Sequence, residues 1–81
     1  MKFNVGDYIK FNVIKNPVKY VGRIHLIQNG FYHFTILLSN KPIPANNRKA
    51  FQIGGKMESH VEKISEKVFN DEKSVFRYHK L

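Results

Sequence analysis

Apolar and polar residues alternate along most of the first 64 positions, which is the periodicity of β-strands with one buried face. The apolar positions hold mainly Ile, Val, Phe and Tyr, which favour strands. Asn16-Pro17, the 40–47 segment and Gly54-Gly55 interrupt the alternation and are predicted to be loops or turns. The pattern predicts an all-β fold of five antiparallel strands, over about residues 8–15, 18–27, 31–38, 49–53 and 57–64.

The hairpin between the second and third predicted strands has two possible registers. A two-residue Asn29-Gly30 turn would place Leu26 opposite His33, with Phe34 and Ile36 on the other face. A three-residue 28–30 loop puts the apolar residues on one face, and Gly30 supplies the left-handed conformation that it needs. We predict the three-residue loop, in which the neighbours on the inner face are Leu26–Tyr32, Ile24–Phe34, Gly22–Ile36 and Tyr20–Leu38.

This register also predicts the interior and the opposite face of the sheet. The interior would be a closed cluster of Ile9, Phe11, Ile24, Leu26, Phe34 and Ile36. The neighbours on the outer face would be Ile27–Phe31, His25–His33, Arg23–Thr35 and Val21–Leu37. Gly22 would allow these long strands to bend sharply into a small curled barrel.

The segment after Ile64 is harder to interpret from its pattern. Ser65 is a candidate N-cap for a short helix through Asn70, with Val68 and Phe69 covering one end of the barrel. Alternatively, the chain turns and residues 74–79 pair as an additional strand. We predict a short helix followed by an extended segment, so that residues 1–64 form the barrel and residues 65–81 a tail that packs on it or extends from it.

Two short motifs resemble those of small SH3-like barrels of the KOW type, which occur in ribosomal and transcription-elongation proteins. Val5-Gly6-Asp7 matches the turn that enters the first strand in that family, and Gly22-Arg23-Ile24 matches its glycine, basic and aliphatic positions in the second strand. The resemblance covers about residues 3–64 and implies a five-stranded SH3-like barrel. Barrels of this type bind RNA, DNA or peptides, so the fold does not choose among these functions.

The charge is unevenly distributed. The chain has 14 Lys and Arg residues against six Asp and Glu, a net charge of +8. Residues 1–56 hold nine of the basic residues and one carboxylate, Asp7, whereas residues 57–81 hold five of each. Such a field attracts polyanions or acidic proteins. An ordinary solvated lysine surface, or a lysine bias of AT-rich coding sequences, is the alternative explanation.

Basic residues interleaved with aromatic ones favour nucleic-acid binding, because cations contact phosphates and rings stack on bases. The sequence therefore predicts a non-enzymatic module that binds DNA or RNA mostly through phosphates. The predicted contact residues are Lys10, Lys15, Lys19, Arg23, Arg48, Lys49 and Lys56, with Lys41 nearby and with Tyr8 and Phe31 as aromatic platforms.

A protein partner is the alternative to nucleic acid. A small basic protein of a phage or mobile element could dock on an acidic surface of a host protein. The anchors would then be the aromatic residues of the tail, since buried aromatics contribute much interface energy. These anchors are Phe69, Phe76 and Tyr78.

Catalysis and metal binding have little support in the sequence. There is no cysteine, and Asp7 is the only carboxylate before residue 58, in a turn where it is expected to bond local backbone. His25 and His33 are predicted to be a surface pair, because a stable zinc site needs three or four ligands. Gly54-Gly55-Lys56 lacks the spacing of a phosphate-binding loop. We therefore expect no cofactor and no metal. We also expect a cytoplasmic protein that does not bind membranes and that is a monomer rather than a dimer.

Overall fold

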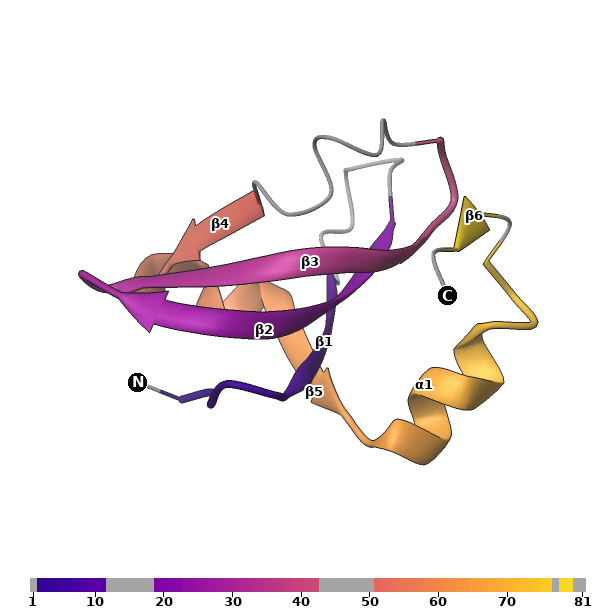
Figure 1. The fold of residues 1–81 in the computed structure, drawn as a ribbon, viewed down its shortest axis with the longest axis horizontal. Coiled ribbons are helices and arrows are strands. Elements are labelled where there is room, and N and C mark those ends of the chain that lie inside the picture. The colour runs from indigo at the N-terminus through magenta and orange to yellow at the C-terminus, as the bar shows by residue number, and fades with distance from the viewer. Residues whose placement is uncertain (1, 12–18, 43–50, 77, 80–81) are drawn as a thin grey trace.

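The computed structural model describes residues 2–11, 19–42, 51–76 and 78–79 (Figure 1). Its elements are β1 (Tyr8–Phe11), β2 (Tyr20–Gln28), β3 (Phe31–Ser39), β4 (Phe51–Gly54), the 3₁₀ helix η2 (Gly55–His60), β5 (Val61–Ile64), α1 (Glu66–Glu72) and β6 (Tyr78–His79). The predicted first and fourth strands extend into residues 12–15 and 49–50, which lie outside the described residues.

Five antiparallel strands form a curled half-barrel in the order β4-β3-β2-β1-β5, and the two-residue strand β6 pairs with the end of β3. Figure 1 shows the long β2–β3 hairpin across the molecule, with β4 along the first half of β3. The helix α1 lies beyond β5, near the C-terminal end of the chain (Figure 1). The all-β prediction, with a short C-terminal helix, is confirmed.

The β2–β3 turn has two residues, so the predicted three-residue loop is wrong. Asn29 and Gly30 both have positive φ, 54° and 79°, and Gln28 pairs directly with Phe31. Two positive φ angles are what a type I′ hairpin turn requires, and Asn-Gly is its preferred sequence. As this turn dictates, Leu26 pairs with His33.

Two irregularities change the register of the hairpin, and the one at His25 returns Ile24, Phe34 and Ile36 to one face. His25 is an extra residue on β2 between the pairs Ile24–Phe34 and Leu26–His33. Leu37 is an extra residue on β3, between the pairs Gly22–Ile36 and Val21–Leu38. Because the His25 bulge shifts the register by one residue, the predicted pairs Ile24–Phe34, Gly22–Ile36 and Arg23–Thr35 are present in spite of the different turn. The Leu37 bulge shifts the register again and places Leu38 opposite Val21.

Other predicted pairs of the hairpin are wrong. The structure pairs Tyr20 with Ser39, Val21 with Leu38 and Ile27 with Tyr32, and His25 does not lie opposite His33. Leu26, predicted to be interior, has 42% of its surface exposed, because it lies on the turn side of the His25 bulge and shares a face with His33.

The buried residues form two clusters, on either side of the curled sheet. In the first, the predicted interior residues Ile9, Ile24, Phe34 and Ile36 are buried and Phe11 packs against them half-buried. Its other buried members are Phe3, Tyr32 and Val61. The second cluster consists of Val21, Leu38, Ile64, Phe69 and Phe76.

The segment after β4 differs from the predicted Gly54-Gly55 turn and fifth strand over 57–64. Residues Gly55–His60 form η2, and only Val61–Ile64 form a strand, which pairs with β1 and not with β4. Met57 is the one large apolar residue between Gly55 and His60, and no residue of η2 is buried. This segment therefore lacks the alternation of apolar and polar residues that a strand with one buried face requires.

The tail follows the prediction of a short helix. Ser65 caps α1, since its hydroxyl oxygen accepts a hydrogen bond from the backbone N–H of Val68 at 3.1 Å. Phe69 on this helix and Phe76 after it are 5% and 9% exposed and belong to the second buried cluster. Among the described residues, a strand of the alternative prediction over 74–79 is present only at its end, where β6, Tyr78–His79, pairs with β3.

A buried hydroxyl joins the N-terminal segment to η2. The Tyr32 hydroxyl donates to Oε1 of Glu58 at 2.5 Å and accepts the backbone N–H of Phe3 at 3.1 Å. The pKa of Glu58 is lowered from its usual 4.5, mainly by this bond from Tyr32 and secondly by a bond from the backbone N–H of Lys2. The pKa of Tyr32 is raised from its usual 10.0, mainly by burial and secondly by the bond to Glu58.

These shifts predict how the stability of the protein depends on pH. A carboxyl whose folded-state pKa is lowered stabilises the protein above its unfolded pKa, here about 4.5, and this contribution is lost as the pH falls through the lowered value. Replacing Glu58 with Gln should therefore reduce the unfolding free energy at neutral pH, and the deficit should shrink as the pH falls below 4.5. Urea denaturation of the wild type and of Glu58→Gln across this pH range measures the difference in unfolding free energy. A difference that does not change with pH would contradict the stabilising role of the ionised Glu58 carboxylate.

Candidate functional site

The predicted basic residues do not all remain available on one surface. Lys10 forms an ion pair with Glu72 of α1, with Nζ 2.7 Å from Oε1, so the helix neutralises this position. Lys19 is half-buried, and its backbone N–H bonds Oδ1 of Asn40. Arg23 on β2, Lys41 after β3 and Lys56 on η2 are exposed. Lys15, Arg48 and Lys49 lie outside the described residues.

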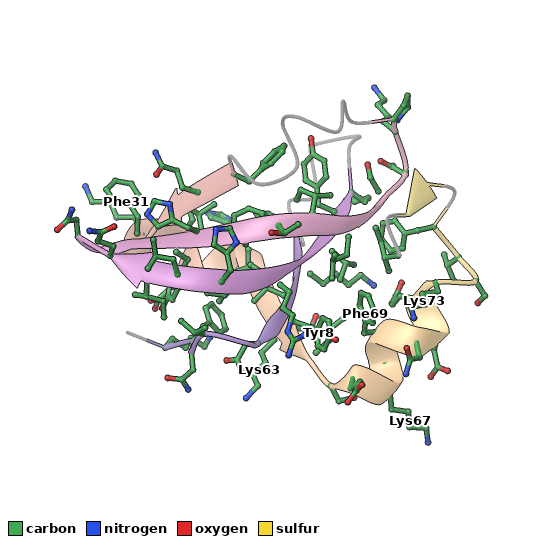
Figure 2. The ribbon with its side chains drawn as sticks, viewed as in Figure 1. Tyr8, Phe31, Lys63, Lys67, Phe69 and Lys73 are labelled. Atoms are coloured by element: carbon green, nitrogen blue, oxygen red, sulfur yellow. The ribbon has the colours of Figure 1, made fainter. Side chains whose placement is uncertain are left out.

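The two predicted aromatic platforms have different surroundings. Tyr8 is half-buried, because the ring of Phe69 stacks on it at 4.3 Å between centroids and the Arg23 guanidinium lies over it at 5.1 Å. It is therefore a packing residue of the α1 contact and not an open platform. Phe31 has 42% of its surface exposed and lies across from Gly54 on β4. Figure 2 shows Phe31 near the turn of the β2–β3 hairpin, far from Tyr8 and Phe69.

The predicted anchors for a protein partner do not form an exposed aromatic surface. Phe69 and Phe76 are buried against β2, β3 and β5 residues in the second cluster, so their prediction as free anchors is wrong. The physical reason is that Val21 and Leu38 leave an apolar surface on this side of the sheet, which the tail covers. Tyr78 lies in β6, where its backbone pairs with Ser39, and its side chain is outside the described part of the chain.

A pocket of about 490 Å³ opens where the N-terminal turn meets the β2–β3 hairpin. We call it the bulge pocket, because both bulge residues, His25 and Leu37, line it. An extra residue in one strand changes which way the neighbouring side chains point, and bulges are frequent next to functional sites. The residues that line the pocket are Val5, Gly6, Arg23, Ile24, His25, Thr35 and Leu37.

Arg23 is the cation of the bulge pocket, and two contacts hold its side chain in place. Its Nε–H donates to the carbonyl oxygen of Gly6 at 3.0 Å, and its guanidinium lies over the ring of Tyr8. Among the described residues that line the pocket there is no carboxylate, and the carboxylates of Glu72 and Asp7 pair with Lys10 and Lys63. Arg23 therefore presents a positioned, planar set of N–H donors to a pocket without negative charge.

The N-terminal turn next to Arg23 has the structure expected of Val5-Gly6-Asp7. Gly6 has φ of 94°, a conformation that favours glycine, and its N–H donates to the carbonyl oxygen of Ile24 at 2.8 Å. The Asp7 carboxylate accepts the backbone N–H of Asn4 at 2.9 Å, so its predicted structural role in the turn is confirmed. This turn places the Gly6 carbonyl where it fixes Arg23.

His25 and Thr35 form the second polar part of the bulge pocket. His25 Nδ1 and Thr35 Oγ1 are 3.1 Å apart, at hydrogen-bond distance. The sequence correctly placed Arg23 beside Thr35, but it assigned His25 to a pair with His33 because its register contained no bulge. Among the described residues, no group of three or more His, Asp or Glu side chains lies close enough to hold a metal ion.

Comparisons with models of known protein families, with curated proteins and with solved structures find no match to this chain. In the part of the chain that the structure describes, no helix has the length and apolar character to cross a membrane.

Proposed function

We propose that this protein is a non-enzymatic module that binds nucleic acid through its phosphates, as a cytoplasmic monomer, with Arg23 as a principal contact. The observation that carries the proposal is the geometry of Arg23, whose guanidinium is fixed by Gly6 and Tyr8 at a pocket with no carboxylate among its described lining residues. An arginine held in this way loses little side-chain freedom on binding, and its planar donors match two oxygens of a phosphate.

The net charge of +8 supports the same proposal. A positive field attracts a polyanion over a distance and speeds its encounter with the protein. Lys56 on η2 is exposed and available for further phosphate contacts. Lys15, Lys19, Arg48 and Lys49 remain predicted contacts of the same kind. With about five phosphates neutralised, the logarithm of the affinity for duplex DNA should fall against the logarithm of salt with a slope of about −4 to −5.

We also propose that the half-barrel is SH3-like. The Val5-Gly6-Asp7 turn that leads into β1 and the position of Gly22 at a bulge, where the strand twists, support this likeness. The antiparallel sheet with β1 between β2 and β5 is compatible with it. This fold assignment is independent of the nucleic-acid proposal, since such barrels have several classes of partner.

Replacing Arg23 with Ala tests the proposed function. The loss of one fixed phosphate contact should weaken binding of a labelled 20-base-pair duplex about tenfold at low salt, and should reduce the magnitude of the salt slope by about 1. Fluorescence anisotropy at several salt concentrations measures both quantities.

The matched control is Lys67→Ala, which removes the same charge. Figure 2 shows Lys67 on the outer side of α1, pointing away from the sheet. This variant should keep the salt slope of the unmodified protein. If wild-type protein shows no salt-dependent binding of DNA or RNA at low ionic strength, or if both variants lose affinity equally, the proposed function is wrong.

A further inference from the structure

We propose that the bulge pocket binds one unstacked nucleotide of a single strand, with its phosphate on Arg23 and its base in the pocket. This inference rests on the proposed function and makes it more specific, because phosphate contacts alone do not distinguish single strands from duplexes. It adds a base-binding role for His25, which the sequence assigned only to a surface pair.

The size and lining of the pocket favour a group larger than a phosphate. Its volume of about 490 Å³ lies in the range of pockets that hold small organic ligands. Val5 and Leu37 contribute apolar surface, which suits the face of a base but adds nothing to the binding of a bare phosphate. Arg23 supplies the charge at the same site, so both halves of a nucleotide find complementary chemistry.

His25 and Thr35 are the groups that can recognise the base. The His25 side chain is exposed, and histidine rings are among the side chains on which unstacked bases stack. Its Nδ1 is engaged with the Thr35 hydroxyl at 3.1 Å, which restrains the ring while leaving Nε2 for the ligand. The bulge at His25 creates this arrangement, because in a regular strand His25 would pair across from a residue of β3.

A base can reach such a pocket only after it leaves its stack. In a duplex, this step breaks base pairing and stacking, whereas a single strand needs little rearrangement. The protein should therefore prefer single strands to duplexes of the same sequence. Stacking of one base on a side chain supports a preference of about tenfold or more at equal salt concentration.

The test compares wild-type protein with His25→Ala and with Leu26→Ala. Leu26 is the neighbouring exposed residue and does not line the pocket, so it is the matched control. By anisotropy, wild type and Leu26→Ala should bind a 20-nucleotide single strand about tenfold more tightly than the duplex. His25→Ala should reduce this preference to about twofold or less and leave the duplex salt slope unchanged. Circular dichroism shows whether the variants are folded.

Amide chemical shifts locate the ligand directly. Titration of the folded protein with a nucleoside monophosphate should shift the resonances of Val5, Gly6, His25, Thr35 and Leu37. Inorganic phosphate, used as the comparison, should affect only the surroundings of Arg23. If phosphate alone reproduces all the shifts, or if the monophosphate shifts residues outside the pocket, the base does not enter and the inference is wrong.

Failure of the inference and failure of the proposed function have different signatures. Equal affinity for single strand and duplex, with a normal salt slope and with sensitivity to Arg23→Ala, overturns the nucleotide pocket and leaves phosphate binding in place. Absence of binding to either polymer at low salt overturns both.

Discussion

Replacement of Phe69 with Ala is expected to lower the unfolding free energy by about 3–5 kcal/mol. Phe69 is 5% exposed, stacks on Tyr8 and packs in the cluster that contains Val21 and Leu38. The substitution removes a ring from this cluster and leaves a cavity under α1, whose closure would require the helix to move. A loss of this size is comparable with the whole stability expected of a domain of this length, roughly 3–5 kcal/mol.

Val68→Ala is the matched control for this prediction. Val68 is the preceding residue of the same helix, and 39% of its surface is exposed. Its truncation should cost less than about 1 kcal/mol. Chemical denaturation monitored by circular dichroism gives both values. If Phe69→Ala is no more destabilising than Val68→Ala, the tail is not part of the core, and residues 1–64 would then behave as an independent barrel.

Gly22→Ala is the second substitution with a large expected effect. A Cβ at this position would lie 2.8 Å from Cδ2 of Phe34 and 2.8 Å from the backbone oxygen of Thr35. The Thr35 oxygen belongs to β3 and cannot rotate away, so the two strands must separate or the bulge next to Gly22 must rearrange. Overpacking of this kind costs about 1–3 kcal/mol.

Gly55→Ala makes the same chemical change where there is space. The nearest atom to its added Cβ would be Oε1 of Glu58 at 4.0 Å, which is ordinary separation. This variant should retain the thermal midpoint of the wild type to within a few degrees, whereas Gly22→Ala should lower it by several degrees for each kcal/mol lost. Equal midpoints for the two variants would show that the hairpin adapts to a side chain at Gly22.

The β2–β3 hairpin shows what alternation alone can and cannot predict. The pairs Ile24–Phe34 and Gly22–Ile36 follow from the need to bury apolar residues on one face, and they are present. The loop inferred from them was wrong, because Asn29-Gly30 fixes a two-residue turn through its own backbone preferences. The His25 bulge allows the two-residue turn and the burial of the apolar residues on one face to occur together. The alternation of residue types does not predict this bulge.

The same limitation applies to the candidate site. Arg23 could be selected from the sequence, because it is a basic residue on a predicted strand, and its position beside Thr35 was correct. The pocket could not be predicted, since it depends on the bulges at His25 and Leu37 and on the path of the N-terminal turn. Tyr8 and Lys10 were predicted to be available, whereas α1 covers the first and neutralises the second through Phe69 and Glu72.

The position of β5 at the end of the strand order has a consequence for self-association. An outer strand offers unpaired backbone groups to which a second molecule can add its own strand, a common route to aggregation. The two central residues of β5, Glu62 and Lys63, are charged and exposed. Charged side chains on a short border strand oppose such an addition, so β5 should resist edge-to-edge polymerisation even in concentrated solution.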